Sequence, residues 1–325
     1  FMSVSLKHRL EYAALLAIAW LFRVLPHKAA FAVAWAGARV AFHIFRFRRR
    51  ETLRRIGFVF GDTLTPRQRR RVAWLSLRNL AFNMVELMRA GRYTYAWLDR
   101  HIDNYAPIMA RLRELVAEHG GLVIGLPHLG NWDLAGIAVH HAGIKIFSVA
   151  GVQRNQLTND WLNRQRGFGL DIIPRGSSAL RQVVRRLRKG EIFAILPDVR
   201  TRRPDLSIPF LGGTANLGRG MAQFARVARV PVLPVIVRRV GWFRHRFDAL
   251  DPLFPDPDAE ADQDLLRITT CIMRQIEAMI RAEPGQWFWY NRRWVLDPLD
   301  AEEPAGEFAE EAPDADHSTP PQETP

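Results

Sequence analysis

Short apolar segments alternate with longer amphipathic segments through the middle of the chain, and few folds accommodate such a pattern. The apolar segments predict strands at residues 122–126, 144–150, 170–173, 192–196 and 232–237. The segments between them predict helices at residues 159–167, 177–189 and 217–230. Strands separated by helices of this length form βαβ units, so the sequence predicts an α/β fold with a mostly parallel central sheet flanked by helices.

The corner after the first predicted strand carries the main candidate for catalysis. Pro127 breaks the strand, and His128 follows it in the sequence His-Leu-Gly-Asn-Trp-Asp133. Histidine suits proton transfer near neutral pH, and Asp133 could hold the imidazole in one tautomer. Helical positions five apart face about 140° away from each other, so the two can meet only if residues 130–131 form a turn. The alternative is a structural loop histidine followed by an aspartate that caps the next helix.

A second polar cluster follows the third predicted strand, in the sequence Pro174-Arg-Gly-Ser-Ser178. It leads into a predicted helix, and the free amides of a helix N-terminus beside an arginine are suited to binding an anion. Arg175 is therefore a candidate for contacting an anionic substrate. The alternative is that Ser177 only caps the helix.

A third cluster begins at Asp198, where the fourth predicted strand ends. Ligands of α/β proteins bind beyond the carboxyl ends of the strands, and glycines permit a close approach of the backbone. We therefore expect a substrate- or oxyanion-binding site that draws on Asn131, Arg154, Arg175, Asp198, Arg200, Arg202, Gly212 and Gly213. Asp198 could instead pair structurally with an arginine, and the arginines could be ordinary loop charges.

The first 50 residues predict two apolar helices associated with a membrane. The uncharged run 12–22 is shorter than the roughly 20 residues that cross a bilayer, and the run 29–45 contains Arg39 and His43. A basic cluster at 46–50 suits lipid headgroups. No clear small-residue cleavage site follows, so we do not expect a cleaved signal peptide. The alternative is a pair of buried core helices.

Charge divides the rest of the chain into two parts. The net charge is +13, yet residues 301–325 contain eight acids and no lysine or arginine, so the preceding residues are more basic than the total. Such a body attracts nucleic acid, anionic lipid, phosphorylated glycolipid or an acidic carrier protein. The acidic, proline-rich segment 300–325 predicts a disordered tail, which leaves residues 51–299 as the α/β domain. The single cysteine, Cys271, excludes an intramolecular disulfide.

Helices are also predicted on both sides of the alternating region. Residues 51–118 are helical in pattern, with Thr65 as an N-cap and Pro66 in the first helical position. A long helix is predicted at 260–283, and an aromatic and basic segment at 286–296 follows it. Its aromatic side chains are expected to pack against the sheet, although such residues also suit a lipid interface.

Several kinds of catalytic site lack their motifs in this sequence. There is no Gly-x-Ser-x-Gly elbow, no Walker loop and no Gly-x-Gly-x-x-Gly after the first predicted strand. Without an evident serine or cysteine nucleophile, we expect His128 to activate a hydroxyl group of the substrate directly.

The ordered set of motifs resembles that of the late acyltransferases of lipid A biosynthesis, the lauroyl and myristoyl transferases, and of relatives that acylate other glycolipids. The sequence from His128 to Asp133 is similar to the His-x4-Asp/Glu motif of the wider glycerolipid acyltransferase superfamily. The resemblance covers about residues 5–298. Its further matches are Arg154-Asn155, Ile173-Pro-Arg-Gly176, Leu196-Pro-Asp198, Ile208-Pro-Phe-Leu-Gly-Gly-Thr214 and the segment from Trp287 to Trp294.

The resemblance implies a membrane-bound O-acyltransferase at the cytoplasmic face of a bacterial inner membrane. His128, oriented by Asp133, would take a proton from a hydroxyl of a lipid A precursor or related glycolipid. That hydroxyl would attack the thioester of an acyl-carrier protein or acyl-CoA. Backbone amides or an arginine, such as Arg154 or Arg175, would stabilise the oxyanion. Neither a cofactor nor a metal is implied.

Two other functions are considered beside this one. Val199 stands where lipid A enzymes often have glutamine, so a phospholipid or another glycolipid, such as a phosphatidylinositol mannoside, is an alternative acceptor. A basic nucleic-acid-binding protein is a remote alternative. It would leave the apolar N-terminal helices and the corner at His128 unexplained, so we expect no nucleic-acid partner.

Overall fold

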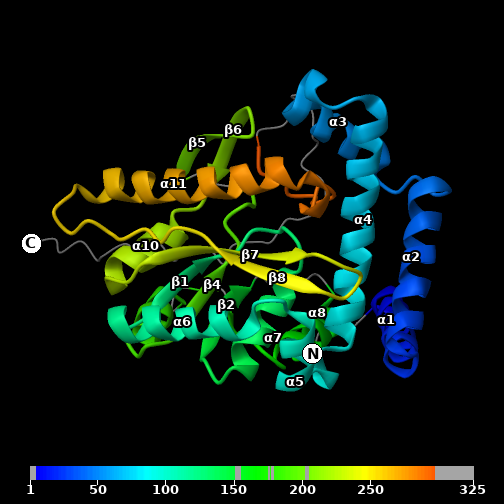
Figure 1. Cartoon of the computed structure of the whole chain (residues 1–325), viewed down its shortest axis with the longest axis horizontal. Coiled ribbons are helices and arrows are strands. Elements are labelled where there is room, and N and C mark those ends of the chain that lie inside the picture. Colours follow the sequence, from blue (N-terminus) through cyan, green and yellow to red (C-terminus); the bar gives the residue numbers. More distant parts are fainter. Residues whose placement is uncertain (1–4, 151–154, 175, 177–178, 202–204, 297–325) are drawn as a thin grey trace, which may run out of the picture.

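The computed structural model describes residues 5–150, 155–174, 176, 179–201 and 205–296 of the chain. A six-stranded sheet of order β3-β2-β4-β1-β7-β8 forms the centre (Figure 1). Its strands are parallel except for β8, which pairs antiparallel with β7 at one edge. The strands are β1 (Leu122–Gly125), β2 (Ile146–Ala150), β3 (Asp171–Pro174), β4 (Ile192–Ile195), β7 (Val232–Arg239) and β8 (His245–Ala249). The predicted α/β fold with a mostly parallel sheet is therefore confirmed.

Helices cover both faces of this sheet. In Figure 1, α10 and α11 lie above it and α6 and α7 below it, with α4 standing upright at one end. The helices before the sheet are α1 (Leu6–Val24), α2 (His27–His43), α3 (Arg49–Phe60), α4 (Pro66–Met88), α5 (Tyr95–His101) and α6 (Tyr105–His119). The later helices are α7 (Trp132–His141), α8 (Gln156–Arg166), α9 (Ala179–Leu187), α10 (Gly220–Ala228) and α11 (Ala261–Ala282).

Alternate side chains of the central strands enter two different hydrophobic cores. Val123 of β1 packs in a core with residues of α9, α10 and α11. Its neighbours Leu122 and Ile124 pack in a second core with residues of α6 and α7. All four residues of β1 are buried, which explains why the strand is a continuous apolar run without polar alternation.

Three strands in the second half of the chain were not predicted. β5 (Leu206–Phe210) and β6 (Gly213–Leu217) form a separate antiparallel hairpin, and β8 lies at the sheet edge. The helix predicted to begin at Leu217 begins instead at Gly220, because residues 213–217 pair with β5. The turn between β5 and β6 has positive φ at both Leu211 and Gly212, a backbone conformation that glycine adopts readily.

The N-terminal helices pack on α4. Ala30, Phe31 and Ala34 of α2 are buried against Phe82 and Val85 of α4. Helix α4 begins where the sequence predicts, because Thr65 and Gln68 cap each other's backbone. Among the described residues, every helix falls short of the length and apolarity needed to cross a bilayer. Many apolar side chains of α1, α2 and the following turn face outward, the most exposed being Leu6, Leu10, Trp20, Val24, Ile44 and Phe45.

Candidate active site

Two adjacent strands bring His128 and Asp198 together at the carboxyl edge of the sheet. The parallel register pairs Gly125 of β1 with Ile195 of β4. Each strand then continues through a Leu-Pro dipeptide to a polar residue, which is His128 after β1 and Asp198 after β4. Because the two residues lie at the same distance beyond paired positions, their side chains meet.

The contact between these two residues is a double hydrogen bond. Asp198 Oδ1 lies 2.8 Å from His128 Nδ1, and Asp198 Oδ2 accepts the backbone N–H of His128 at 2.8 Å. The side chain of Asp198 is fully buried, whereas that of His128 is 18% exposed. With Nδ1 engaged, Nε2 is the ring nitrogen that a substrate can approach. This is the arrangement of an imidazole held in one tautomer by a buried carboxylate.

Asp198 is held in its charged form. Burial opposes ionisation, but the charge of His128 and hydrogen bonds from His128 and Trp287 outweigh this and lower the pKa of the Asp198 carboxyl. The indole Nε1 of Trp287 donates to Asp198 Oδ2 at 2.8 Å. With the charged Asp198 bonded to Nδ1, Nε2 is the ring nitrogen that can accept a proton from a substrate.

The aromatic segment near residue 288 closes the site. The backbone N–H of Phe288 donates to the carbonyl of His128 at 2.9 Å. Trp287 and Trp289 are buried, which confirms that these aromatic side chains pack inside the protein. The ring centre of Trp132 lies 4.9 Å from that of His128, and Phe288 lies 6.0 Å from Trp132. His128 is thus partly exposed beside the aromatic rings of Trp132 and Phe288.

The backbone at Gly130 has a conformation that favours glycine. Gly130 has φ of +68°, and a Cβ atom at this position would lie 1.7 Å from the carbonyl oxygen of Val237. Only glycine fits there. Asn131 follows as the N-cap of α7, because its side chain accepts the backbone N–H of Leu134 at 3.0 Å.

The expected partner of His128 requires a correction. Asp133 lies in the first turn of α7 and its Oδ1 bonds with Arg166 Nε of α8 at 3.0 Å. Its Oδ2 is buried without a hydrogen-bond partner among the described residues. The carboxylate that orients His128 is Asp198, because α7 directs Asp133 toward α8. A role of Asp133 in the reaction stays a prediction.

The other predicted site residues are distributed over several places. Asn131 is buried, and its Nδ2 donates to Glu86 Oε2 at 2.5 Å, so both polar ends of its side chain are engaged within the protein. Gly212 lies in the turn of the β5–β6 hairpin, and Gly213 begins β6, where it lies against Leu296 and Phe58. The carbonyl of Arg200 accepts from Arg293. Arg154, Arg175 and Arg202 lie outside the described residues.

Sequence reasoning assigned Asp198 to substrate binding and missed Trp287 as its partner. One sequence signal was available for Asp198. The dipeptide Leu-Pro followed by a polar residue occurs after both predicted strands, at Leu126-Pro-His128 and Leu196-Pro-Asp198. Nothing in the local sequence indicates that Trp287, 89 positions beyond Asp198, donates to it.

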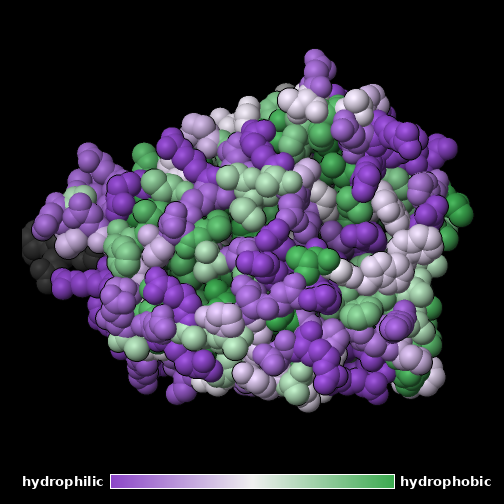
Figure 2. Space-filling model, in the orientation of Figure 1, coloured by the Kyte–Doolittle hydropathy of each residue, from purple (hydrophilic) through white to green (hydrophobic). Residues whose placement is uncertain are grey.

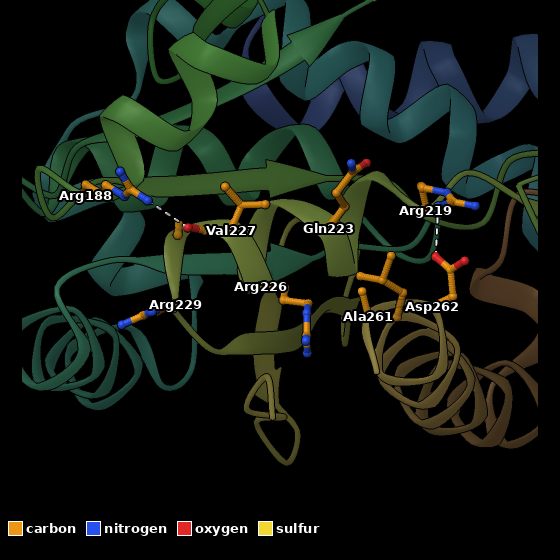
Figure 3. A pocket seen from close by; sticks show the side chains of 10 residues that line it. Arg188, Arg219, Gln223, Arg226, Val227, Arg229, Ala261 and Asp262 are labelled. Carbon is orange, nitrogen blue, oxygen red and sulfur yellow. Dashed lines mark hydrogen bonds and ion pairs between the residues drawn. The ribbon is translucent and has the colours of Figure 1, made fainter. Parts of the chain in front are cut away.

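A separate basic cleft of about 680 Å³ lies along α10 beside the start of α11 (Figure 3). Its lining includes neither His128 nor Asp198. Arg219 pairs across it with Asp262 at 3.1 Å, and Arg188 donates to the carbonyl of Val227 (Figure 3). Arg219 and Arg188 thus join neighbouring segments of the protein, and these segments are far in sequence from the His128 loop.

Comparison with known proteins identifies similar chains. The sequence model described as bacterial lipid A biosynthesis acyltransferase matches residues 3–295. A phosphatidylinositol mannoside acyltransferase of Mycobacterium tuberculosis is 22% identical over 216 residues, which cover 65% of this chain and 66% of that protein. One from Mycolicibacterium smegmatis is 22% identical, covering 55% and 59%. A lipid A biosynthesis acyltransferase of Haemophilus influenzae is 24% identical, covering 56% of each chain. The matched region thus spans between about half and two thirds of these relatives.

Proposed function

Since the chain belongs to the bacterial lipid A biosynthesis acyltransferase family, we propose that it transfers a fatty acyl chain to a hydroxyl group of a glycolipid. The observation that carries this proposal is the buried Asp198 bonded to Nδ1 of a partly exposed His128. A histidine held in this way is equipped to activate a hydroxyl, and relatives named for acylating glycolipids are 22% and 24% identical to the chain over the matched residues.

The proposed reaction is general-base catalysis of acyl transfer. Nε2 of His128 takes the proton of the acceptor hydroxyl while the oxygen attacks the thioester carbonyl carbon. The C–S bond then breaks, and the imidazolium returns the proton to the departing thiolate. Asp198 stabilises the imidazolium between these two steps. In this mechanism Asp198 takes the orienting role that the sequence assigned to Asp133.

The oxyanion of the tetrahedral intermediate needs a donor near His128. We retain Arg154 and Arg175 as candidates, because both follow strands that end at the same edge of the sheet as β1. Arg166, held by Asp133, is a further cation next to α7. In this proposal Asp133 contributes by holding Arg166.

The substrates are proposed from charge and from the relatives' names. The body of the protein is strongly basic, which suits an acidic acyl-carrier protein or the phosphates of acyl-CoA as donor. An anionic glycolipid is proposed as acceptor, either a lipid A precursor, as the Haemophilus protein's name suggests, or a phosphatidylinositol mannoside, as the mycobacterial names suggest.

We also propose that the protein works on the cytoplasmic face of a bacterial inner membrane. Trp20 of α1 is 66% exposed, and Ile44 and Phe45 after α2 are 69% and 76% exposed. Apolar groups mix with polar ones along the right-hand edge of Figure 2, where α1 and α2 lie in Figure 1. Large apolar side chains beside the arginines of residues 46–50 suit insertion among anionic lipid headgroups.

The testing experiment offers purified protein a labelled acyl-carrier protein with three acceptors in parallel. These are a lipid A precursor, an inositol mannoside lipid and a lysophospholipid. Acyl transfer to one acceptor is expected, with a loss of about 10²- to 10⁴-fold for His128→Ala. Equal transfer by the wild-type protein and by His128→Ala would exclude the proposed base. Transfer only to the lysophospholipid would move the function to phospholipid acylation.

A further inference from the structure

The buried face of α4 carries a row of polar side chains that hold the loops around His128. Ser76, Asn79, Asn83 and Glu86 recur at intervals of three and four residues, so they lie on one face of the helix. All four are buried, between 1% and 4% exposed. Burying polar side chains lowers the stability of a protein unless each one is hydrogen-bonded. The hydrogen-bond partners of these four side chains therefore indicate why they are buried.

Each member of the row bonds a loop that shapes the site. Ser76 Oγ donates to the carbonyl of Trp287 at 2.6 Å, and Asn79 Nδ2 donates to that of Gly285 at 3.0 Å. Asn83 Nδ2 donates to the carbonyl of Gly130 at 2.6 Å. The first two bonds fix the segment that carries the partner of Asp198. The third fixes the loop of His128 itself.

Glu86 is the charged end of the row. Its Oε2 accepts from Asn131 Nδ2 at 2.5 Å, and its Oε1 lies 2.7 Å from His245 Nε2. Arg239 forms an ion pair with the same carboxylate, and both side chains are 1% exposed. Arg239 also donates to Asn83 Oδ1 at 2.7 Å. The Glu86–Arg239 ion pair therefore fixes Glu86, which bonds Asn131, and Asn83, which bonds Gly130.

Its partners hold the Glu86 carboxylate in its charged form. Burial would raise its pKa, but Arg239 and His245 lower the pKa of Glu86 to about 2. Burial lowers the pKa of His245, whose Nε2 lies beside the Glu86 carboxylate. A charged acceptor gives a stronger and more directional bond to Asn131 than a neutral acceptor would.

We propose that Glu86 is a positioning residue for His128, acting through Asn131 and Asn83 on the loop that carries the imidazole. This inference rests on the proposed general-base role of His128. Asn131 caps α7 and precedes Trp132, whose ring packs on His128. Without the hydrogen bond from Asn131 to Glu86, the N-cap of α7, the ring of Trp132 and the loop of His128 are all held less firmly. The imidazole of His128 then loses its alignment with Asp198.

The first test compares Glu86→Gln with the control Asp264→Asn. Asp264 is also fully buried and paired with Arg226, but it lies at the start of α11, and no hydrogen bond among the described residues joins it to the His128 loop. Both variants should lower Tm. Glu86→Gln should also lower kcat by about 10- to 100-fold with little change in KM, as expected for a misaligned catalytic group. Equal kcat values for the two variants would show that Glu86 has only a structural role.

The second test exchanges the acid and the amide between the two positions. In Glu86→Gln with Asn131→Asp, the glutamine amide can donate to the new carboxylate, which can still cap α7. One negative charge stays near Arg239. Recovery of kcat relative to Glu86→Gln is expected, and no recovery in a folded double variant would contradict the positioning role.

A spectroscopic readout separates this inference from the proposed function. The NMR signal of the His128 ring proton bonded to Asp198 should move or broaden in Glu86→Gln and stay in place in Asp264→Asn. If the wild-type protein shows no His128-dependent acyl transfer, the proposed function fails, while the NMR comparison still tests the positioning. An unchanged His128 signal in Glu86→Gln overturns the inference.

Discussion

At the scale of single residues, the choice of carboxylate determines how His128 works. Two acids are candidates, and they differ in what they touch. Asp198 contacts His128 at both its imidazole and its backbone, whereas Asp133 contacts Arg166. A group that stabilises the imidazolium must lie beside it, so in the proposed mechanism this stabilisation comes from Asp198.

The two acids can be ranked by matched substitutions. Asp198→Asn keeps the shape but removes the charge, so kcat should fall by about 10²- to 10⁴-fold, as when a triad loses its acid. Asp133→Asn should cause a much smaller loss, because His128 keeps its partner. Steady-state kinetics with circular dichroism as a folding control gives the comparison. A larger loss for Asp133→Asn than for Asp198→Asn would restore the dyad expected from the sequence.

The difference between these acids also shows the limit of sequence reasoning. His128 and Asp198 were identified as site candidates because each follows the end of a predicted strand, which leaves a local signal. Asp133 was chosen as partner because it is near in sequence. The real contact depends on the register between β1 and β4, which is set by packing of the whole sheet.

At the scale of elements, the junction between α1 and α2 contains a titratable contact. His27 begins α2 and packs among the rings of Phe31, Trp97 and Phe243. Burial, with a contribution from the charge of Arg89, lowers the pKa of His27 to about 4. A protonated His27 does not suit this aromatic cluster, so acid should weaken the contact of α2 with α5.

The direction of the His27 pKa shift determines whether acid raises or lowers the stability of the protein. The folded pKa lies below the ordinary value of 6.5, so the contribution to stability is complete above pH 6.5 and is lost as the pH falls toward 4. His27→Phe keeps a ring in the cluster and removes the titration. Its Tm should decline less than that of the wild-type protein between these pH values. Parallel declines in thermal melts would show that other groups cause the acid sensitivity.

Secondary structure was predicted best where a pattern is local. The strand and helix alternation and the start of α4 followed from periodicity and capping. The β5–β6 hairpin and β8 were not predicted. Residues 213–217 are a strand only because they pair with β5, and β8 depends on its pairing with β7. The sequence of a segment does not by itself show which other strand it pairs with.

At the scale of the whole molecule, the proposed membrane contact has a direct test. Ile44→Glu with Phe45→Glu places two charges where apolar side chains are exposed, so binding to vesicles with anionic lipid should weaken by at least about tenfold. Leu266→Glu on α11, at a position 43% exposed, is the matched control and should bind like the wild-type protein. Vesicle co-sedimentation measures this. Equal binding by both variants would place the contact on another surface.

The contact between Trp287 and Asp198 joins parts of the chain that a ribosome makes far apart in time. The helices proposed to meet the membrane are made before the strand that leads to His128. The indole that bonds Asp198, and the amide of Phe288 that bonds the His128 carbonyl, are made after all the strands of the sheet. A growing chain therefore makes the helices of the proposed membrane contact before it can complete the hydrogen bonds around His128.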